Sequence, residues 1–197
     1  MVMINEILAS VRDTLESALQ AGHSRDEDWL RLTNLGAPDG SAATDLNNSI
    51  VMTVAAFQVD ASLGAYQMPR LGTGDSFGMA SAPLFLDTYV LFVSCFADAA
   101  YATGLAALSR IIQFFQEHPV FDGAHAPDID ARMGPLAIEY ASLDFAQASH
   151  LSSLAGLKGQ PFLLYRLRRL PFAGPAIADV APAVRRAPPA ALLPAAT

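Results

Sequence analysis

Two stretches of the sequence carry residue types and spacings that could bind a phosphate or a metal ion. The glycine-rich segment 71–78 could cradle a phosphate, but Phe77 stands where a dinucleotide-binding fingerprint needs its third glycine, and no Gly-Lys-Ser/Thr follows. The metal-capable side chains of segment 117–130 match neither a helical His-Glu-x-x-His site nor a calcium-binding loop. We therefore predict that neither stretch binds a cofactor or a metal ion. The side chains of the second stretch are Glu117, His118, Asp122, His125, Asp128 and Asp130.

The residues that could act as a nucleophile or a base lack chemical partners. Cys95, the only cysteine, lies in an apolar run that predicts a buried strand, where a thiol is a small hydrophobic side chain. His150 lies beside Leu151 in a short predicted helix, and the sequence implies no acidic partner for it. The spacing Gly-x-Ser-x-Gly occurs at residues 74–78, but this stretch has no strand-to-helix pattern and so does not form a nucleophile elbow. We predict no catalytic residue and a protein that is not an enzyme, because a hydrolase or metal enzyme needs a matched set of such side chains.

Three arginines in and after one predicted strand are candidates for contact with another protein. Arg166 and Arg168 alternate with apolar residues and share a strand face with Phe162 and Leu164, and Arg169 follows them. This mixed face is either a solvated strand edge or a surface that binds a partner. The sequence leaves both interpretations open, so the three arginines are candidate interface residues.

The composition fits one folded domain and argues against two kinds of partner. A chain of 197 residues, 52% of them hydrophobic and 16% charged, is long enough for a single core. Its net charge of −7 repels phosphate backbones, so we predict no nucleic-acid partner. The first residues lack the basic start and apolar core of a signal peptide, and Asp98 and Arg110 interrupt the most apolar stretch, 89–115. We therefore predict synthesis and assembly in the cytoplasm without direct membrane insertion.

Hydrophobic periodicity places the elements of the first half of the chain. Apolar residues recur at three- and four-residue steps over residues 4–22, which predicts an amphipathic helix. The β-branched segment 50–59 predicts a strand, and the almost continuously apolar segment 84–96 predicts a strand in the middle of a sheet. Residues 60–83 are rich in Gly, Ser and Pro and show no period, so we predict one long loop there.

The clearest helical pattern follows residue 98. Asp98 is a candidate cap for this helix, and Pro119 ends it. We predict that Leu108 and Ile112 lie in the core, because both fall on the apolar stripe of the helix. The stripe consists of Tyr101, Leu105, Leu108, Ile112 and Phe115.

The second half adds a strand at 136–143, a short helix at 144–156 that Asp144 and Gln147 begin as a capping box, and a strand from residue 161. The predicted fold class is α+β, a single domain whose mixed or antiparallel sheet of about four strands packs with two longer helices and one short helix. Residues 1–172 form this domain, and the Ala/Pro-rich residues 173–197 form an extended arm without a core. The arm's candidate interface residues are Ile177, Val180, Val184, Leu192 and Leu193.

Four segments between residues 4 and 170 share their residues and their order with one protein family. The longest runs from Tyr101 to Phe121, and the others are residues 4–8, 83–92 and 143–168, the last of which includes His150-Leu151. In these segments the chain resembles the tail-terminator, or cap, family of extracellular contractile injection systems of the antifeeding-prophage and virulence-cassette type.

The resemblance implies a fold similar to phage tail terminators and a structural function. Members of such a family form a six-membered ring on the end of the inner tube and sheath and stop their growth. The implied partners are copies of the chain itself, a sheath protein and an inner tube protein, and the implied location is a phage-tail-like particle that is released or stays with the cell. An alternative is a soluble adaptor outside any tail, with the proline-rich arm as a ligand for another domain.

Overall fold

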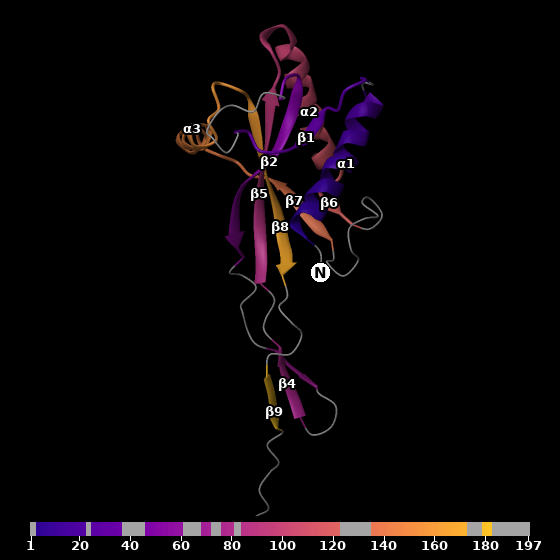
Figure 1. The fold of residues 1–197 in the computed structure, drawn as a ribbon, viewed down its shortest axis with the longest axis vertical. Helices are drawn as coiled ribbons and strands as arrows, with labels where there is room; N and C mark the ends of the chain where they lie inside the picture. The colour runs from indigo at the N-terminus through magenta and orange to yellow at the C-terminus, as the bar shows by residue number, and fades with distance from the viewer. Residues whose placement is uncertain are drawn as a thin grey trace, which may run out of the picture. The chain divides into compact units, whose positions relative to one another are not determined.

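The computed structural model of the 197-residue chain describes residues 3–22, 25–36, 46–60, 68–71, 76–80, 84–122, 135–172 and 179–182. The chain divides into two compact units. Unit 1 comprises Met1–Ser62 and Phe85–Pro171, and unit 2 comprises Leu63–Leu84 and Phe172–Thr197. Figure 1 shows the ribbon of both units, each of which is described by itself below.

Six strands form one sheet in unit 1: β1 (Leu30–Leu32), β2 (Ser49–Val59), β5 (Leu84–Cys95), β6 (Val120–Phe121), β7 (Leu136–Tyr140) and β8 (Phe162–Phe172). Their order in the sheet is β1-β2-β5-β8-β7-β6, so β5 lies in the interior as its apolar sequence predicts. β1 runs parallel to β2, whereas the pairs β2–β5, β6–β7 and β7–β8 are antiparallel. The sheet is therefore mixed.

Three helices complete unit 1: α1 (Ile4–Gly22), α2 (Tyr101–Glu117) and α3 (Phe145–Leu154). The predicted fold class is thus confirmed, with two longer helices, one short helix and a mixed sheet. The predicted number of strands, about four, was too low. The two short edge strands have three and two residues, and runs of that length are too short to show the two-residue period of a strand.

The helices cover opposite faces of this sheet (Figure 1). On one face, α2 places Phe115 with its ring centroid 5.8 Å from that of Phe92 on β5 and 4.6 Å from that of Tyr165 on β8. On the other face, α3 contributes Leu151 to a cluster around the buried Leu91. Unit 1 therefore has one sheet between two apolar layers, with α1 and α2 on one side and α3 on the other.

Glu16 of α1 fixes the start of β1. Its carboxylate oxygens accept hydrogen bonds from the backbone N–H groups of Trp29, at 3.0 Å, and Leu30, at 2.7 Å. Two backbone donors that would otherwise need another acceptor are satisfied in this way. The bonds hold the chain against α1 and leave the indole of Trp29 next to α2.

Two predictions about α2 were wrong. Asp98 does not cap the helix, because it begins a short 3-10 turn, Asp98–Ala100, and the N-cap residue Ala100 makes no side-chain hydrogen bond. Ile112 is not in the core, since its side chain is 38% exposed, whereas Leu108 is buried as predicted. The buried face instead includes Gly104, where a Cβ would collide with Ser94 Oγ and lie 2.9 Å from the ring of Phe96. Small residues let α2 approach the sheet closely. The face of α2 that is buried is therefore the one with small residues, and not the one centred on the larger apolar side chains.

Unit 2 contains a three-stranded sheet in the order β3-β4-β9. Its strands are β3 (Met68–Leu71), β4 (Ser76–Ala80) and β9 (Asp179–Pro182), and both pairings are antiparallel. The prediction of one loop over 60–83 was wrong for β3 and β4. Short strands that contain Pro69 and Gly78 lack the β-branched alternation on which that prediction relied.

Candidate interaction surfaces

A row of polar side chains crosses the sheet of unit 1 on the same face as α3. Asp87 of β5 is 1% exposed, and its Oδ2 accepts a hydrogen bond of 2.9 Å from Arg166 Nε of β8 as well as one from Arg166 Nη2. This hydrogen bonding raises the pKa of the Arg166 guanidinium. A buried carboxylate needs such a paired charge, so the two residues stabilise each other across neighbouring strands.

The row continues on both sides of this ion pair. Arg168 Nη1 donates to Glu139 of β7 at 3.0 Å, and the Glu139 side chain is about half exposed. Toward the other edge, Tyr89 Oη donates to Gln58 of β2 at 3.0 Å. Cross-strand pairs of this kind stabilise a sheet and leave a polar surface on the part of the face that α3 does not cover.

The predicted interface residues fall into three groups. Arg166 and Arg168 share one strand face, as predicted, and both form ion pairs within unit 1. Val180 lies in β9 opposite Gly78, while the side chains of Val180 and Arg169 are not described. The remaining predicted residues, Ile177, Val184, Leu192 and Leu193, lie outside the described residues. Contact of any of these residues with a partner stays a prediction.

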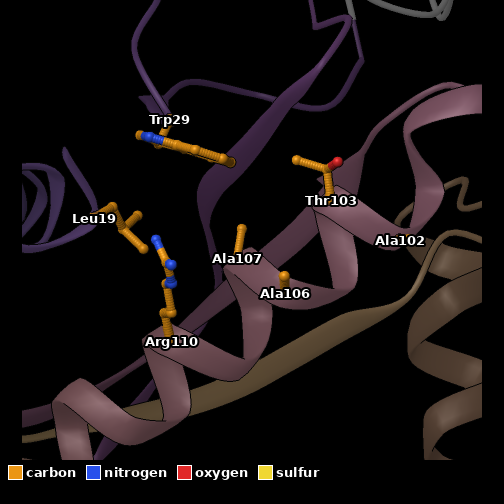
Figure 2. Close-up of a pocket in the computed structure, with 7 residues that line it drawn as sticks. All are labelled: Leu19, Trp29, Ala102, Thr103, Ala106, Ala107 and Arg110. Atoms are coloured by element: carbon orange, nitrogen blue, oxygen red, sulfur yellow. The ribbon is translucent and has the colours of Figure 1, made fainter. Parts of the chain in front are cut away.

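A hollow of about 310 Å³ lies between the end of α1, the segment before β1, and α2 (Figure 2). The indole of Trp29 faces α2 across this hollow, and Leu19 of α1 and Arg110 of α2 approach it from the side. Ala102, Thr103 and Ala106 on the α2 side are exposed, whereas the other apolar lining residues are buried. The hollow is therefore an apolar recess open to solvent. Its lining residues are Leu19, Trp29, Ala102, Thr103, Ala106, Ala107 and Arg110.

One arginine lines this apolar recess and another lies against its Trp29 wall. The Arg25 guanidinium lies 4.8 Å from the centroid of the Trp29 ring and 5.9 Å from that of Phe96, distances that allow cation–π attraction. Arg25 also pairs with Glu27 at 2.8 Å. Arg25 does not line the hollow, whereas the guanidinium-bearing Arg110 does. The recess thus combines an apolar wall with positive charge.

Helix α3 presents apolar side chains to solvent on the other face of the sheet. Phe145 is 92% exposed and Leu154 is 87% exposed, and no residue of α3 falls in the fully buried class. The helix start is fixed by the predicted capping box, in which Asp144 Oδ1 accepts from Gln147 N at 2.7 Å and Gln147 Oε1 accepts from Asp144 N at 3.0 Å. A large apolar side chain held on a capped helix and exposed to water is typical of a contact surface.

Helix α2 also has an apolar flank that the sheet does not cover. Tyr101 is 48% exposed, Leu105 39% and Ile112 38%. At 100° per residue these three positions lie side by side, next to the buried position of Leu108. The apolar arc of α2 is therefore wider than the face that it buries within unit 1.

The described residues contain neither a cluster of metal ligands nor a thiol with a lowered pKa. Among them, no three His, Cys, Asp or Glu side chains are placed to hold a metal ion, and His125, Asp128 and Asp130 lie outside the described ranges. Burial raises the pKa of the Cys95 thiol, which favours its uncharged and less nucleophilic form. In the parts of the chain that the structure covers, no helix has the length and apolar character needed to cross a bilayer.

A comparison of the sequence with models of protein families identifies the family of the chain. A model of the Pvc16 N-terminal domain matches residues 6–186, which is most of the chain. The chain belongs to the Pvc16 N-terminal domain family. No curated protein matches it significantly.

Two solved structures share the fold of this family member. The sheath/tube terminator of the extracellular contractile injection system PVC, in its extended state, aligns with a TM-score of 0.66 at 10% identity. The cap of the anti-feeding prophage, a tube-terminating cap, aligns with a TM-score of 0.55 at 8% identity. The alignments cover 100% and 95% of this chain, but only 66% and 61% of the two longer chains. At these identities the likeness establishes the fold.

The sequence did not reveal the residues that shape the exposed apolar surfaces. Trp29 lies in a polar, turn-rich stretch, so nothing local indicated that it forms the wall of a recess beside α2. The exposure of Phe145 could have been predicted, because this residue directly follows the capping residue Asp144 in a helix with little amphipathic pattern. An aromatic residue in such a helix need not face the core.

Proposed function

We propose that the chain is a structural capping subunit that ends the inner tube and contractile sheath of a phage-tail-like injection particle and so terminates their polymerisation. The observation that carries this proposal is the fold likeness over 100% of the chain to a sheath/tube terminator. The likeness of 95% of the chain to a tube-terminating cap supports the same role. A terminator acts by binding a growing end, so its function requires surfaces and not a catalytic site.

The capping subunit acts as a closed ring of six copies. Head-to-tail contacts between identical subunits form a ring when the rotation per subunit closes, and each subunit then needs two different surfaces. Unit 1 has two such surfaces, the recess beside α2 and the exposed Phe145 at the start of α3, on opposite faces of its sheet. Exposed apolar side chains on both faces support association with other protein subunits.

The partners are copies of the chain, the sheath protein and the inner tube protein. The net charge of −7 disfavours contact with nucleic acid, and direct insertion into a membrane is not part of the role. The subunit assembles in the cytoplasm as a component of the particle. Residues 1–172 provide the helices and all strands but β9, and the arm 173–197, which supplies β9 to unit 2, also reaches a neighbouring subunit. The arm's contacts are Ile177, Val180, Val184, Leu192 and Leu193, beside Arg166, Arg168 and Arg169 of the domain.

The test is the length of the particles when the chain is missing. In cells that produce the particles, deletion of its gene is expected to give uncapped tubes and sheaths with a broad distribution of lengths, measured by electron microscopy. Expression of the intact chain in trans should restore a narrow distribution. Capped particles of normal length in the deletion strain would contradict the proposal and favour a soluble adaptor outside the tail.

A further inference from the structure

We propose that Phe145 of one copy inserts into the hollow between Trp29 and α2 of a second copy, and that this contact joins the copies head to tail. The inference rests on the proposed ring and names the contact that forms it. It commits to a second copy of this chain as the occupant of the hollow. The inserting side chain and the hollow both lie in unit 1, where their placement is defined.

Phe145 has the properties of an anchor residue. Its side chain is 92% exposed, so burying it in a partner removes a large apolar area from water without any rearrangement of unit 1. It is the first residue of α3, and the capping box of Asp144 and Gln147 fixes the backbone there. An aromatic side chain on a preformed helix loses little conformational freedom on binding, because it has only two rotatable bonds.

The hollow fits an aromatic ring. Its volume of about 310 Å³ lies between the indole of Trp29 and the small residues Ala106 and Ala107 of α2 (Figure 2). A phenyl ring between an indole and a helix surface packs with both, and aromatic pairs favour offset or edge-to-face geometry. The inserting helix also carries small residues, because Ala148 and Ser149 lie one turn after Phe145. The two helices can therefore approach each other closely.

The charges of the two surfaces are complementary. Asp144 stands directly before Phe145, while the guanidinium of Arg110 lines the hollow. Two copies that each carry a net charge of −7 repel each other, so local attraction between opposite charges is needed to set the orientation.

The position of the two surfaces requires a head-to-tail arrangement. α3 packs through Leu151 on the sheet face that carries Leu91, whereas α2 packs through Phe115 on the face that carries Phe92. Phe145 and the hollow therefore lie on opposite sides of the sheet within one chain. Each copy has one free anchor and one free hollow, which is the requirement for a heterologous contact that closes into a ring.

Sedimentation equilibrium of the complete chain tests the contact with a matched pair of variants. Phe145→Ser is expected to raise the dissociation constant of self-association by about tenfold or more, because it removes the anchor. Leu154→Ser is the control, since Leu154 is 87% exposed on the same helix but lies about 180° away from Phe145. It should associate like the unchanged chain. Both side chains are exposed, so both variants should keep the melting temperature of the parent.

Filling the hollow provides an independent test of the same contact. Ala106→Phe blocks the hollow but leaves Phe145 intact, so this variant alone should be as monomeric as Phe145→Ser. An equimolar mixture of the two variants restores one intact anchor and one intact hollow. The mixture should therefore form dimers and nothing larger, because each dimer ends in a damaged anchor and a damaged hollow. Asp144→Asn keeps a capping side chain and removes the charge, and should weaken association several-fold.

Three results would overturn the inference: a parent chain that stays monomeric at about 100 µM, a Phe145→Ser variant that associates like the parent, or a mixture of the two variants that stays monomeric. Particle length separates this inference from the proposed function. If Phe145→Ser particles are capped normally while the gene deletion disturbs their length, the function stands and the Phe145 contact is wrong. If the deletion leaves particle length unchanged while Phe145→Ser abolishes self-association, the contact stands and the terminator function is wrong.

Discussion

The phenol of Tyr165 is buried between the sheet of unit 1 and α2. It is 1% exposed, and its ring lies 4.6 Å from that of Phe115 and 5.4 Å from that of Tyr140. Its hydroxyl has no hydrogen-bond partner among the described residues. Desolvation by burial, with a smaller contribution from Tyr140, raises the pKa of Tyr165 to about 12. Ionisation of this hydroxyl therefore makes the free energy of unfolding depend on pH in the alkaline range.

We predict that Tyr165 destabilises the fold at high pH. Below about pH 10 the phenol is protonated in both the folded and unfolded states, so its contribution is constant. Between this pH and about 12 only the folded state keeps the proton, so the free energy of unfolding falls as pH rises. Urea titrations at pH 8, 10 and 11 should show this loss in the parent and a shallower loss in Tyr165→Phe. The exposed Tyr101→Phe serves as control, and equal pH slopes in all three proteins would contradict the assignment.

The Asp87–Arg166 ion pair should make the two residues strongly coupled. Arg166→Met leaves the carboxylate of Asp87 buried without this partner, which should lower the free energy of unfolding by about 3 kcal/mol. Adding Asp87→Leu to this variant removes the buried charge and should recover part of the loss. Chemical denaturation of both single variants and the double variant gives the coupling energy. Additive effects would show that the pair does not act as a unit.

The strand face of each arginine in these ion pairs could be predicted from the sequence, but its partner could not. Alternation along residues 162–168 was enough to place Arg166 and Arg168 on one face, because a strand has a fixed two-residue period. Their partners could not be predicted. Asp87 lies 79 residues before Arg166, and the choice of β5 as the neighbour of β8 depends on the order of strands in the whole sheet.

At the scale of elements, α2 shows how a helix can be predicted correctly with its buried face misplaced. Its extent followed from the spacing of apolar residues and from Pro119. Its phase did not, because the large residues Tyr101, Leu105 and Ile112 outweighed Gly104 and Ala107 in the pattern, although the small residues are the ones that face the sheet. Close approach of helix and sheet is a tertiary property that hydropathy does not report.

The corrected phase of α2 predicts opposite effects of one substitution at two positions. Leu108→Asp buries an unpaired charge and should cost several kcal/mol, about enough to prevent folding of a domain of ordinary stability. Ile112→Asp places a charge at a position that is 38% exposed, and should change stability by less than about 1 kcal/mol. Thermal melts monitored by circular dichroism distinguish them. A Leu108→Asp variant that melts like the parent would disprove the assigned phase.

Helix α3 depends on its capping box to an unusual degree. It has ten residues, and none of them is fully buried, so packing contributes less to it than to α1 or α2. Asp144→Ala should lower stability by about 1 kcal/mol and increase amide exchange in the first turn of α3. Asp144→Asn should preserve protection, because asparagine also caps. Equal exchange in the parent and Asp144→Ala would indicate that the Leu151 contacts alone hold the helix.

At the scale of the whole molecule, the two units should respond differently to loss of the arm. All six strands and three helices of unit 1 lie at or before residue 172, so a chain truncated after Gly174 should keep the melting temperature of unit 1. The truncation removes β9, the partner of β4, so amide exchange in β4 should increase. Hydrogen exchange measured by mass spectrometry reports both effects. A truncated chain in which β5 and β8 lose protection would show that unit 1 depends on the arm.

The pairing of β4 with β9 also sets the order in which the molecule can be completed during synthesis. Ser76 pairs with Pro182 and Met79 with Asp179, so the second segment of unit 1, Phe85–Pro171, lies between the two strands in the sequence. A nascent chain can fold the helices and strands of unit 1 before β9 has left the ribosome. Until then β3 and β4 form only a two-stranded hairpin, which is marginally stable by itself. The sheet of unit 2 therefore forms only on chains that extend through β9, and a chain interrupted earlier lacks it although unit 1 is folded.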